Sequence, residues 1–153
     1  MRLLAIDPGP VESAYVVYHP EARSVTQFWK GPNVEFTQPP HAHACAIEMV
    51  ASYGMAVGAE VFETCVWVGR LMERWLAEYP WIEPRRVYRR DVKLHLCGNA
   101  RAKDANIRQA LVDRYGGKEK AIGRKASPGP LYGITGDCWA ALAVAVTAAE
   151  AGA

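Results

Sequence analysis

The sequence predicts an α/β fold, in which helices flank a mixed central sheet of three antiparallel strands followed by parallel strands. Short β-rich segments follow one another between residues 3 and 30, with no helical pattern between them. A fourth apolar segment, 44–50, precedes a long helical pattern over 58–79 and a further short strand. An alanine-rich helical pattern follows near the end. The element order is therefore three antiparallel strands, a strand, a long helix, a strand and further helices, which is typical of an α/β fold with a mixed sheet.

Composition and length indicate one globular domain, which we expect to span 1–153. Half of the residues are hydrophobic and 22% are charged. No apolar run approaches the roughly 18 residues of a membrane-spanning helix, and the N-terminus lacks a basic-then-apolar signal pattern. We therefore expect a cytoplasmic protein with no membrane partner. The cysteines have no metal-binding or redox spacing and are expected to be buried thiols: Cys45, Cys65, Cys97 and Cys138.

The first strand, Leu3–Ile6, ends in Asp7, and Pro8 and Gly9 then turn the chain away. Four consecutive apolar residues are typical of a strand that is buried on both faces. A carboxylate at the end of such a strand loses water and needs a compensating charge, often a metal ion. Alternatively, Asp7 starts the turn by bonding to its backbone.

Two further β-rich segments, 13–19 and 24–30, flank a turn at 20–23 and complete a three-stranded antiparallel meander. The proline-rich stretch 31–40 is an irregular connection. His41 and His43 are too few for a metal site, and we expect them in a loop or at a strand edge.

The segment 44–50 repeats the pattern of the first strand, because an apolar run reaches a carboxylate, Glu48, just before a loop. If the two strands are neighbours, Asp7 and Glu48 meet at one edge of the sheet. Two carboxylates that close repel unless one is protonated or a cation lies between them, and a divalent metal is the simplest resolution.

The segment 58–79 is a long amphipathic helix that Pro80 ends. Its apolar positions recur at steps of three and four residues: Val61, Phe62, Cys65, Val68, Gly69, Met72, Trp75 and Leu76. Such a stripe packs in the core or in a dimer interface. We consider Trp67 and Trp75 candidates for the interface, with core packing as the alternative.

The second half of the chain predicts a strand at 86–89, a helix at 91–97 ended by Gly98, and a helix from Asp104, its N-cap, to Tyr115. The stretch 116–136 has no periodicity, and we expect a mobile loop there. The last helix opens at 135–137 and continues to 146. Asp137 lies in its first turn, where helix capping is one explanation and metal binding is another.

Charge is divided unevenly along the chain. Between Arg85 and Lys125 thirteen Lys and Arg residues stand against four acids, whereas the remainder holds five basic residues and twelve acids. This asymmetry indicates a basic surface for a polyanion and an acidic cluster elsewhere. A solvated helix face is the alternative explanation.

Five segments carry a resemblance to a known family: Ala5-Ile6-Asp7-Pro8-Gly9, Ala46-Ile47-Glu48, Asp91-Val92-Lys93, Ala102-Lys103-Asp104-Ala105-Asn106-Ile107 and Gly136-Asp137-Cys138-Trp139-Ala140-Ala141-Leu142-Ala143-Val144-Ala145. Their order and spacing resemble the ribonuclease-H-like superfamily, in particular the phage-type branch of the RuvC family of Holliday-junction resolvases. The resemblance covers essentially the whole chain, and it implies a ribonuclease-H-like fold.

The resemblance implies a homodimeric endonuclease that resolves branched DNA, such as four-way junctions, with two Mg²⁺ or Mn²⁺ ions per active site and no organic cofactor. By the same analogy Asp7 bridges both ions, and Glu48 and Asp137 bind one each or orient the attacking water. Lys103, with Lys93, resembles lysines that neutralise phosphate near the cut, so Lys103 joins the catalytic set. The side chains that we expect to bind DNA are Arg89, Arg90, Lys93, Arg101, Lys103, Arg108, Lys118, Lys120, Arg124 and Lys125.

One position departs from the family. RuvC proteins carry an acid one helical turn after Asp137, where this chain has Ala140, so one metal ligand is missing. Either Asp137 alone suffices, or Asp104, a possible auxiliary acid, or a substrate oxygen completes the second site. Helix capping also explains Asp104.

Other functions remain open on the sequence. They are a ribonuclease-H-type or flap nuclease that acts on another nucleic acid, and a non-catalytic module that binds branched DNA. A small-molecule kinase of the actin-like superfamily also begins with an Asp-bearing strand, but the glycine-rich phosphate loops of that superfamily are not evident here.

Overall fold

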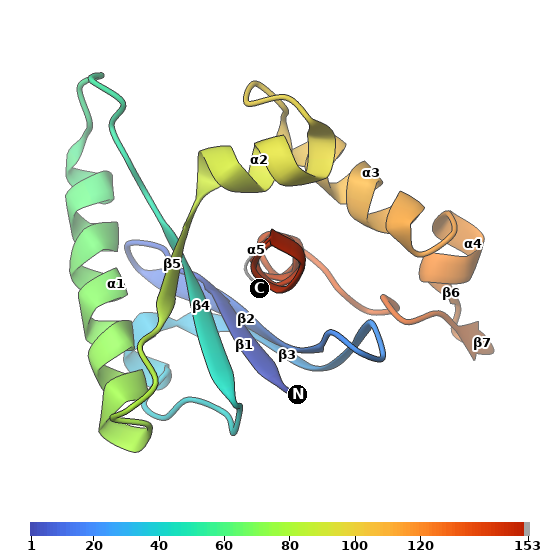
Figure 1. Ribbon diagram of the computed structural model, residues 1–153, viewed down its shortest axis with the longest axis horizontal. Helices are drawn as coiled ribbons and strands as arrows, with labels where there is room; N and C mark the ends of the chain where they lie inside the picture. The colour runs from blue at the N-terminus through green and yellow to red at the C-terminus, as the bar shows by residue number, and fades with distance from the viewer. Residues whose placement is uncertain (152–153) are drawn as a thin grey trace.

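The computed structural model describes residues 1–151, whose centre is a five-stranded mixed sheet (Figure 1). Three strands form the antiparallel meander, and two more are added in parallel on the other side of the first, in the order β3-β2-β1-β4-β5. The strands are β1 (Leu3–Asp7), β2 (Glu12–His19), β3 (Ser24–Pro32), β4 (Ala44–Met49) and β5 (Arg85–Tyr88). The predicted α/β class and mixed sheet are confirmed.

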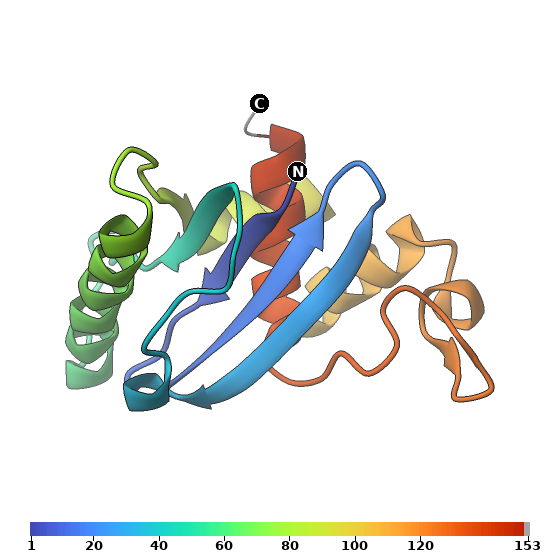
Figure 2. The ribbon, with the colours of Figure 1, turned by 90° about the horizontal axis from the view of Figure 1, so that it is seen from below.

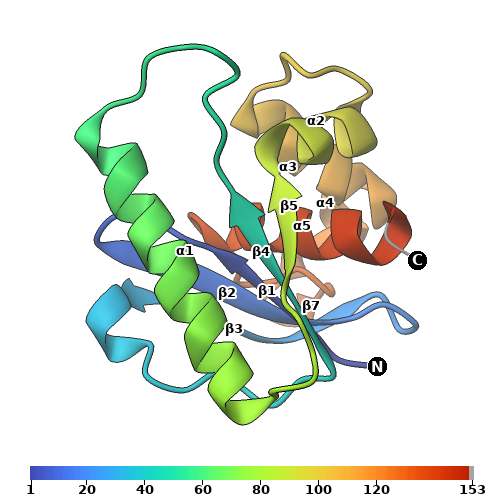
Figure 3. The same ribbon diagram turned by 60° about the vertical axis from the view of Figure 1, so that its left-hand side comes forward.

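Helices cover both faces of this sheet. The helix α1 (Ala59–Glu78) lies across one face, and α5 (Cys138–Ala151) crosses the other (Figure 3). Two further helices, α2 (Arg89–Cys97) and α3 (Asp104–Arg114), pack on α5 from outside. The side chains of β1 alternate between the two faces, which gives each face its own hydrophobic core.

The two tryptophans that were candidates for an interface are both buried, and Trp75 belongs to the core under α1. Trp75 is fully buried and Trp67 is 8% exposed, so both pack inside the molecule. The buried stripe of α1 is also shifted from the predicted one, because Phe62 is 62% exposed. It comprises Thr64, Trp67, Val68, Leu71 and Trp75.

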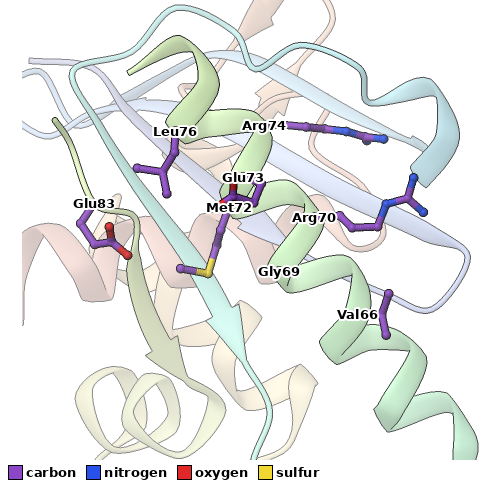
Figure 4. A pocket seen from close by; sticks show the side chains of 8 residues that line it. All are labelled: Val66, Gly69, Arg70, Met72, Glu73, Arg74, Leu76 and Glu83. Carbon is purple, nitrogen blue, oxygen red and sulfur yellow. The ribbon is translucent and has the colours of Figure 1, made fainter. Parts of the chain in front are cut away.

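An open groove runs along the outer side of α1 (Figure 4). Its lining mixes apolar and charged side chains of the helix with one residue from the segment before β5: Val66, Gly69, Arg70, Met72, Glu73, Arg74, Leu76 and Glu83. Two exposed apolar residues, Phe62 and Val66, stand one helical turn apart on the same helix.

The helix α5 is buried on nearly all sides between the sheet and the outer helices (Figure 2). Its small side chains let the helix approach the sheet closely, since alanine adds little bulk. All five strands of the sheet contact it, β1 and β2 most extensively. The alanine-rich pattern therefore marks the central helix of the second core.

The stretch 116–136 was predicted to lack regular structure, and it contains a short helix and a small hairpin instead. These are α4 (Lys118–Ala121), β6 (Gly123–Arg124) and β7 (Ser127–Pro128). The buried side chains of Ala121, Leu131 and Ile134 join the core around α5. Leu131 and Ile134 lie ten and thirteen residues after Ala121. Because these three apolar positions form no continuous helical or strand period, no pattern in the sequence indicates this structure. The mobility of this stretch stays a prediction.

Helix starts differ from those predicted by one or two residues. The helix α2 begins at Arg89 rather than Asp91, and Lys103 instead of Asp104 is the N-cap of α3. The predicted stop at Gly98 is confirmed, because this residue is left-handed, with φ of 67°. Among residues 1–151, no helix is long and apolar enough to span a membrane.

Candidate metal and nucleic-acid site at the strand ends

Asp7 and Glu48 lie side by side at the ends of two adjacent parallel strands. The register sets Ile6 of β1 beside Ile47 of β4, so the two acids are the next residues of their strands. Asp7 also pairs with Ala14 of β2. Paired residues point to the same face, and here that face is the one covered by α5. The sequence-based prediction that these acids meet agrees with the structure.

The two carboxyl groups share a buried, low-dielectric position. Burial, followed by the charges of Glu48 and Asp137, raises the pKa of Asp7 from 3.8 to about 8. Burial likewise raises the pKa of Glu48, against the lowering effect of Arg89. The carboxyls are within hydrogen-bonding reach of each other when Asp7 carries the proton. At neutral pH the pair therefore holds a proton that a cation can replace.

The donors of this pair fit a hard divalent cation. Glu48 is 8% exposed, and its Oε2 atom has no hydrogen-bond donor among the described residues. An orphaned buried carboxylate oxygen beside a second carboxylate is the kind of ligand set that Mg²⁺ and Mn²⁺ prefer.

Asp137, the residue before α5, lies near this pair but is bound to a lysine. Its Oδ2 atom is 2.9 Å from Nζ of Lys30, which is also 3.8 Å from Oε2 of Glu12. Asp7 and Asp137 line one open cavity together with the turn 8–12. Within the described part of the chain, no three His, Cys, Asp or Glu side chains converge on one metal position. Asp137 is thus paired with Lys30 and does not converge with Asp7 and Glu48 in this structure.

Arg89, the first residue of α2, connects Glu48 with Asp104. Its Nε atom is 3.8 Å from Oε1 of Glu48, and its Nη2 atom forms an ion pair with Oδ1 of Asp104. The Arg89 side chain is 27% exposed, compared with 10% for Glu48 and 88% for Asp104. Asp104 is therefore linked to the acid pair only through Arg89. It is not the N-cap of α3, because that residue is Lys103.

A small cavity adjoins the acids on the side of α3 and α5. Ala140 lines it, together with Asp137, Asp104 and Arg89. The position where the resemblance expects an acid therefore faces the arginine. Across this cavity Arg108 stacks on the ring of Trp139, 4.8 Å from its centroid.

The turn after Asp7 is held by a buried polar network. The backbone N–H of Gly9 donates to Oγ of Ser13 at 3.2 Å, and the Ser13 hydroxyl donates to Oδ1 of Asn33 at 2.5 Å. Nδ2 of Asn33 donates to the Gly9 carbonyl at 2.8 Å, and Arg74 of α1 donates to the Asn33 carbonyl. Asn33 begins the 3-10 helix η1 (Asn33–Glu35). A Cβ at Gly9 would lie 2.3 Å from the Glu12 carbonyl oxygen, so this turn requires glycine.

The predicted DNA-binding side chains fall into two groups. Near the acids, Lys93 lowers the pKa of Glu48, and Lys103 precedes Asp104 at the start of α3. Arg89, Arg90, Arg101 and Arg108 are on α2, α3 and the turn between them. The second group, Lys118, Lys120, Arg124 and Lys125, lies on α4 and the hairpin, on the side of α3 away from α2 (Figure 1). The structure does not bring this second group to the acid pair.

Two features of the site were not anticipated from the sequence. Lys30 was not singled out, although it pairs with Ala14, which pairs with Asp7 in the same row of the sheet. The meander register alone would have placed it there. Arg89 was expected to bind DNA, and its contacts with two acids depend on the packing of α2, which no local pattern reveals.

Comparison with known proteins shows that this chain is similar to solved structures in its fold. No protein-family model and no curated protein sequence matches the chain. Among solved structures, a RuvC structure from Thermus thermophilus is similar over 97% of this chain and 93% of that one, with a TM-score of 0.67 and 16% identity. Another, T. thermophilus RuvC in complex with Holliday junction substrate, has the same coverage, a TM-score of 0.65 and 17% identity. The chain therefore has the ribonuclease-H-like fold of RuvC, as expected.

Proposed function

We propose that this protein is a structure-selective DNA endonuclease that resolves Holliday junctions by metal-assisted phosphodiester hydrolysis. The observation that carries the proposal is the buried Asp7–Glu48 pair at adjacent strand ends of a RuvC-like fold. One of the similar structures is a complex with a Holliday junction substrate, which supports branched DNA as the substrate.

In this proposal Asp7 and Glu48 hold Mg²⁺ or Mn²⁺, joined by Asp137 once it parts from Lys30. The metal supplies Lewis-acid activation of water and of the scissile phosphate. The protein contributes a rigid turn beside Asp7 and basic side chains that bind the phosphates, with Lys103 near the cut. The resemblance predicts two ions per site.

The proposed assembly is a homodimer. A four-way junction is cut symmetrically when two active sites act on two strands, and a two-fold dimer supplies both. The groove along α1 and its exposed neighbours Phe62 and Val66 form the surface that we assign to this contact.

A second candidate, a junction-binding module without nuclease activity, is favoured by one observation. Ala140 stands where the family has an acid, and the described residues contain no group of three converging metal ligands. Against this candidate, burial and mutual repulsion of the two carboxyl groups destabilise the fold unless a cation binds between them.

The test is cleavage of a synthetic four-way junction with Mg²⁺ or Mn²⁺, beside linear duplex and an RNA–DNA hybrid, for the wild type and Asp7→Asn. We expect paired symmetric nicks in the junction only, abolished by EDTA and by the substitution. Cleavage of the RNA–DNA hybrid instead of the junction would refute the proposed substrate and would indicate a ribonuclease-H-type activity. Tight junction binding without cleavage under either metal would favour the binding module.

A further inference from the structure

Arg89 lies between Glu48 and Asp104, so a positive charge stands directly beside the Asp7–Glu48 pair. It is within 4 Å of Glu48 on one side and paired with Asp104 on the other. A guanidinium is permanently charged and presents its N–H groups in a plane, so it holds two carboxylates in place without a metal.

The residue opposite Arg89 is neutral. Ala140 lines the same small cavity as Arg89 and Asp104. A carboxylate at position 140, where the family pattern has one, would bring a further acid into the cavity beside Asp137 and Asp104. With alanine there, Asp104 is the acid that remains on this side, and it is already neutralised by Arg89.

We propose that Arg89 supplies the positive charge that the family pattern assigns to a second metal ion, so that each site holds a single divalent cation between Asp7 and Glu48. This inference rests on the proposed nuclease function and departs from the two ions that the resemblance predicts.

The chemistry assigned to Arg89 is stabilisation of negative charge at the phosphate. Its side chain is 27% exposed, so N–H groups remain accessible to a strand bound along α2 and α3. A fixed guanidinium beside a phosphate stabilises the charge that develops in the transition state, with no reorganisation at that moment. It would therefore act on the phosphate directly, as a catalytic residue.

The test counts bound ions, by calorimetric titration with Mn²⁺ and by the electron paramagnetic resonance (EPR) spectrum of bound Mn²⁺. It uses the full chain alone and with a nicked duplex, the product of the proposed reaction, so that no cleavage occurs during titration. The proteins are the wild type, Arg89→Gln, the double variant Arg89→Gln/Ala140→Asp, and Arg85→Gln. The last is a matched control, because it removes the same charge at the far end of β5. Thermal melts show that each is folded.

We expect one Mn²⁺ per wild-type chain, and two in the double variant with dipolar broadening between them. Loss of the nearby positive charge should tighten Mn²⁺ binding by Arg89→Gln about tenfold. Junction cleavage by the same variant should fall about 100-fold, as for the loss of one transition-state charge donor. Arg85→Gln should bind Mn²⁺ within about twofold of the wild type, because solvent and salt screen its charge.

Opposite changes in affinity and rate distinguish this role from a structural one, since a misplaced α2 would weaken both. Two ions in the wild type, or weaker Mn²⁺ binding by Arg89→Gln, would overturn the inference. If the double variant does not fold, the Mn²⁺ affinity and the cleavage rate of Arg89→Gln decide whether the inference holds. One bound ion without cleavage of any junction would refute the proposed function and leave the one-ion site standing, whereas no bound ion would refute both.

Discussion

At the scale of single residues, the site depends on two neighbouring carboxyl groups, of which Asp7 keeps its proton up to a pH of about 8. The raised pKa of Asp7, about 8, means that the metal-free protein retains a proton there at neutral pH. A metal that binds to the pair must displace this proton, so its affinity rises with pH. The same arrangement makes the stability of the folded state depend on pH.

Asp7→Asn should flatten the pH dependence of stability in EDTA. In the unfolded chain Asp7 ionises near 3.8 and in the folded chain near 8. Its stabilising contribution is therefore complete below pH 4 and is lost as pH rises towards 8, on the order of 1.4 kcal/mol for each pH unit between the two pKa values. Between pH 5 and 8 the free energy of unfolding should fall less for the variant than for the wild type. At pH 8 the variant should therefore be the more stable of the two.

Urea unfolding at several pH values measures this effect. Asp113→Asn, an exposed acid on α3, is the control and should follow the wild type. Parallel curves for the wild type and Asp7→Asn would show that Asp7 does not hold the proton.

At the scale of elements, the turn after β1 is fixed by contacts from β2, η1 and α1. Asn33 is 1% exposed and bonds through both ends of its side-chain amide, while its own N–H donates to the Val11 carbonyl at 2.8 Å. A buried network in which every group is satisfied makes a loop rigid. Here it fixes the path of the chain directly after Asp7, the last residue of β1.

Asn33→Ala should destabilise the protein by about 1–3 kcal/mol, because the Gly9 carbonyl and the Ser13 hydroxyl lose buried partners. We also expect junction cleavage to fall more than junction binding, since Asp7 is no longer held. Urea unfolding and parallel binding and cleavage assays check both. Asn99→Ala, in the exposed turn after α2, should change stability by less than about 0.5 kcal/mol. Equal losses of stability in the two variants would contradict the role of the network.

Sequence patterns predicted those elements whose signals are local. The strand endings at Asp7 and Glu48, the helix 58–79 and the stop at Gly98 each follow from a run, a period or a glycine. Features that depend on contacts between distant segments were missed. Lys30 reaches Asp137 across 107 positions, and the hairpin within 116–136 is anchored by isolated apolar residues that have no period.

At the scale of the whole molecule, the proposed dimer needs a surface that the core does not use. The tryptophans of α1 are buried, which leaves Phe62 and Val66, 62% and 52% exposed, on the outer side of that helix. Exposed apolar residues beside a groove are typical of a contact surface.

Val66→Glu should give a monomer, because a charge buried against the partner costs several kcal/mol. Light scattering after size exclusion, with and without a four-way junction, measures the mass. Val34→Glu, a substitution of an exposed valine on η1, is the control and should stay dimeric. A dimeric Val66→Glu would place the interface elsewhere, and a wild type that is monomeric with and without the junction would refute the dimer.

The burial of α5 also bears on the order in which the chain folds during synthesis. This helix fills the second core against all five strands of the sheet, yet it is translated after all of them. A nascent chain that has emerged only through α3 presents the sheet face beneath α5 without its cover, and it lacks Asp137. Non-local contacts of this kind form late. The chain therefore acquires its second core and Asp137, the third acid of the proposed site, in the same folding step.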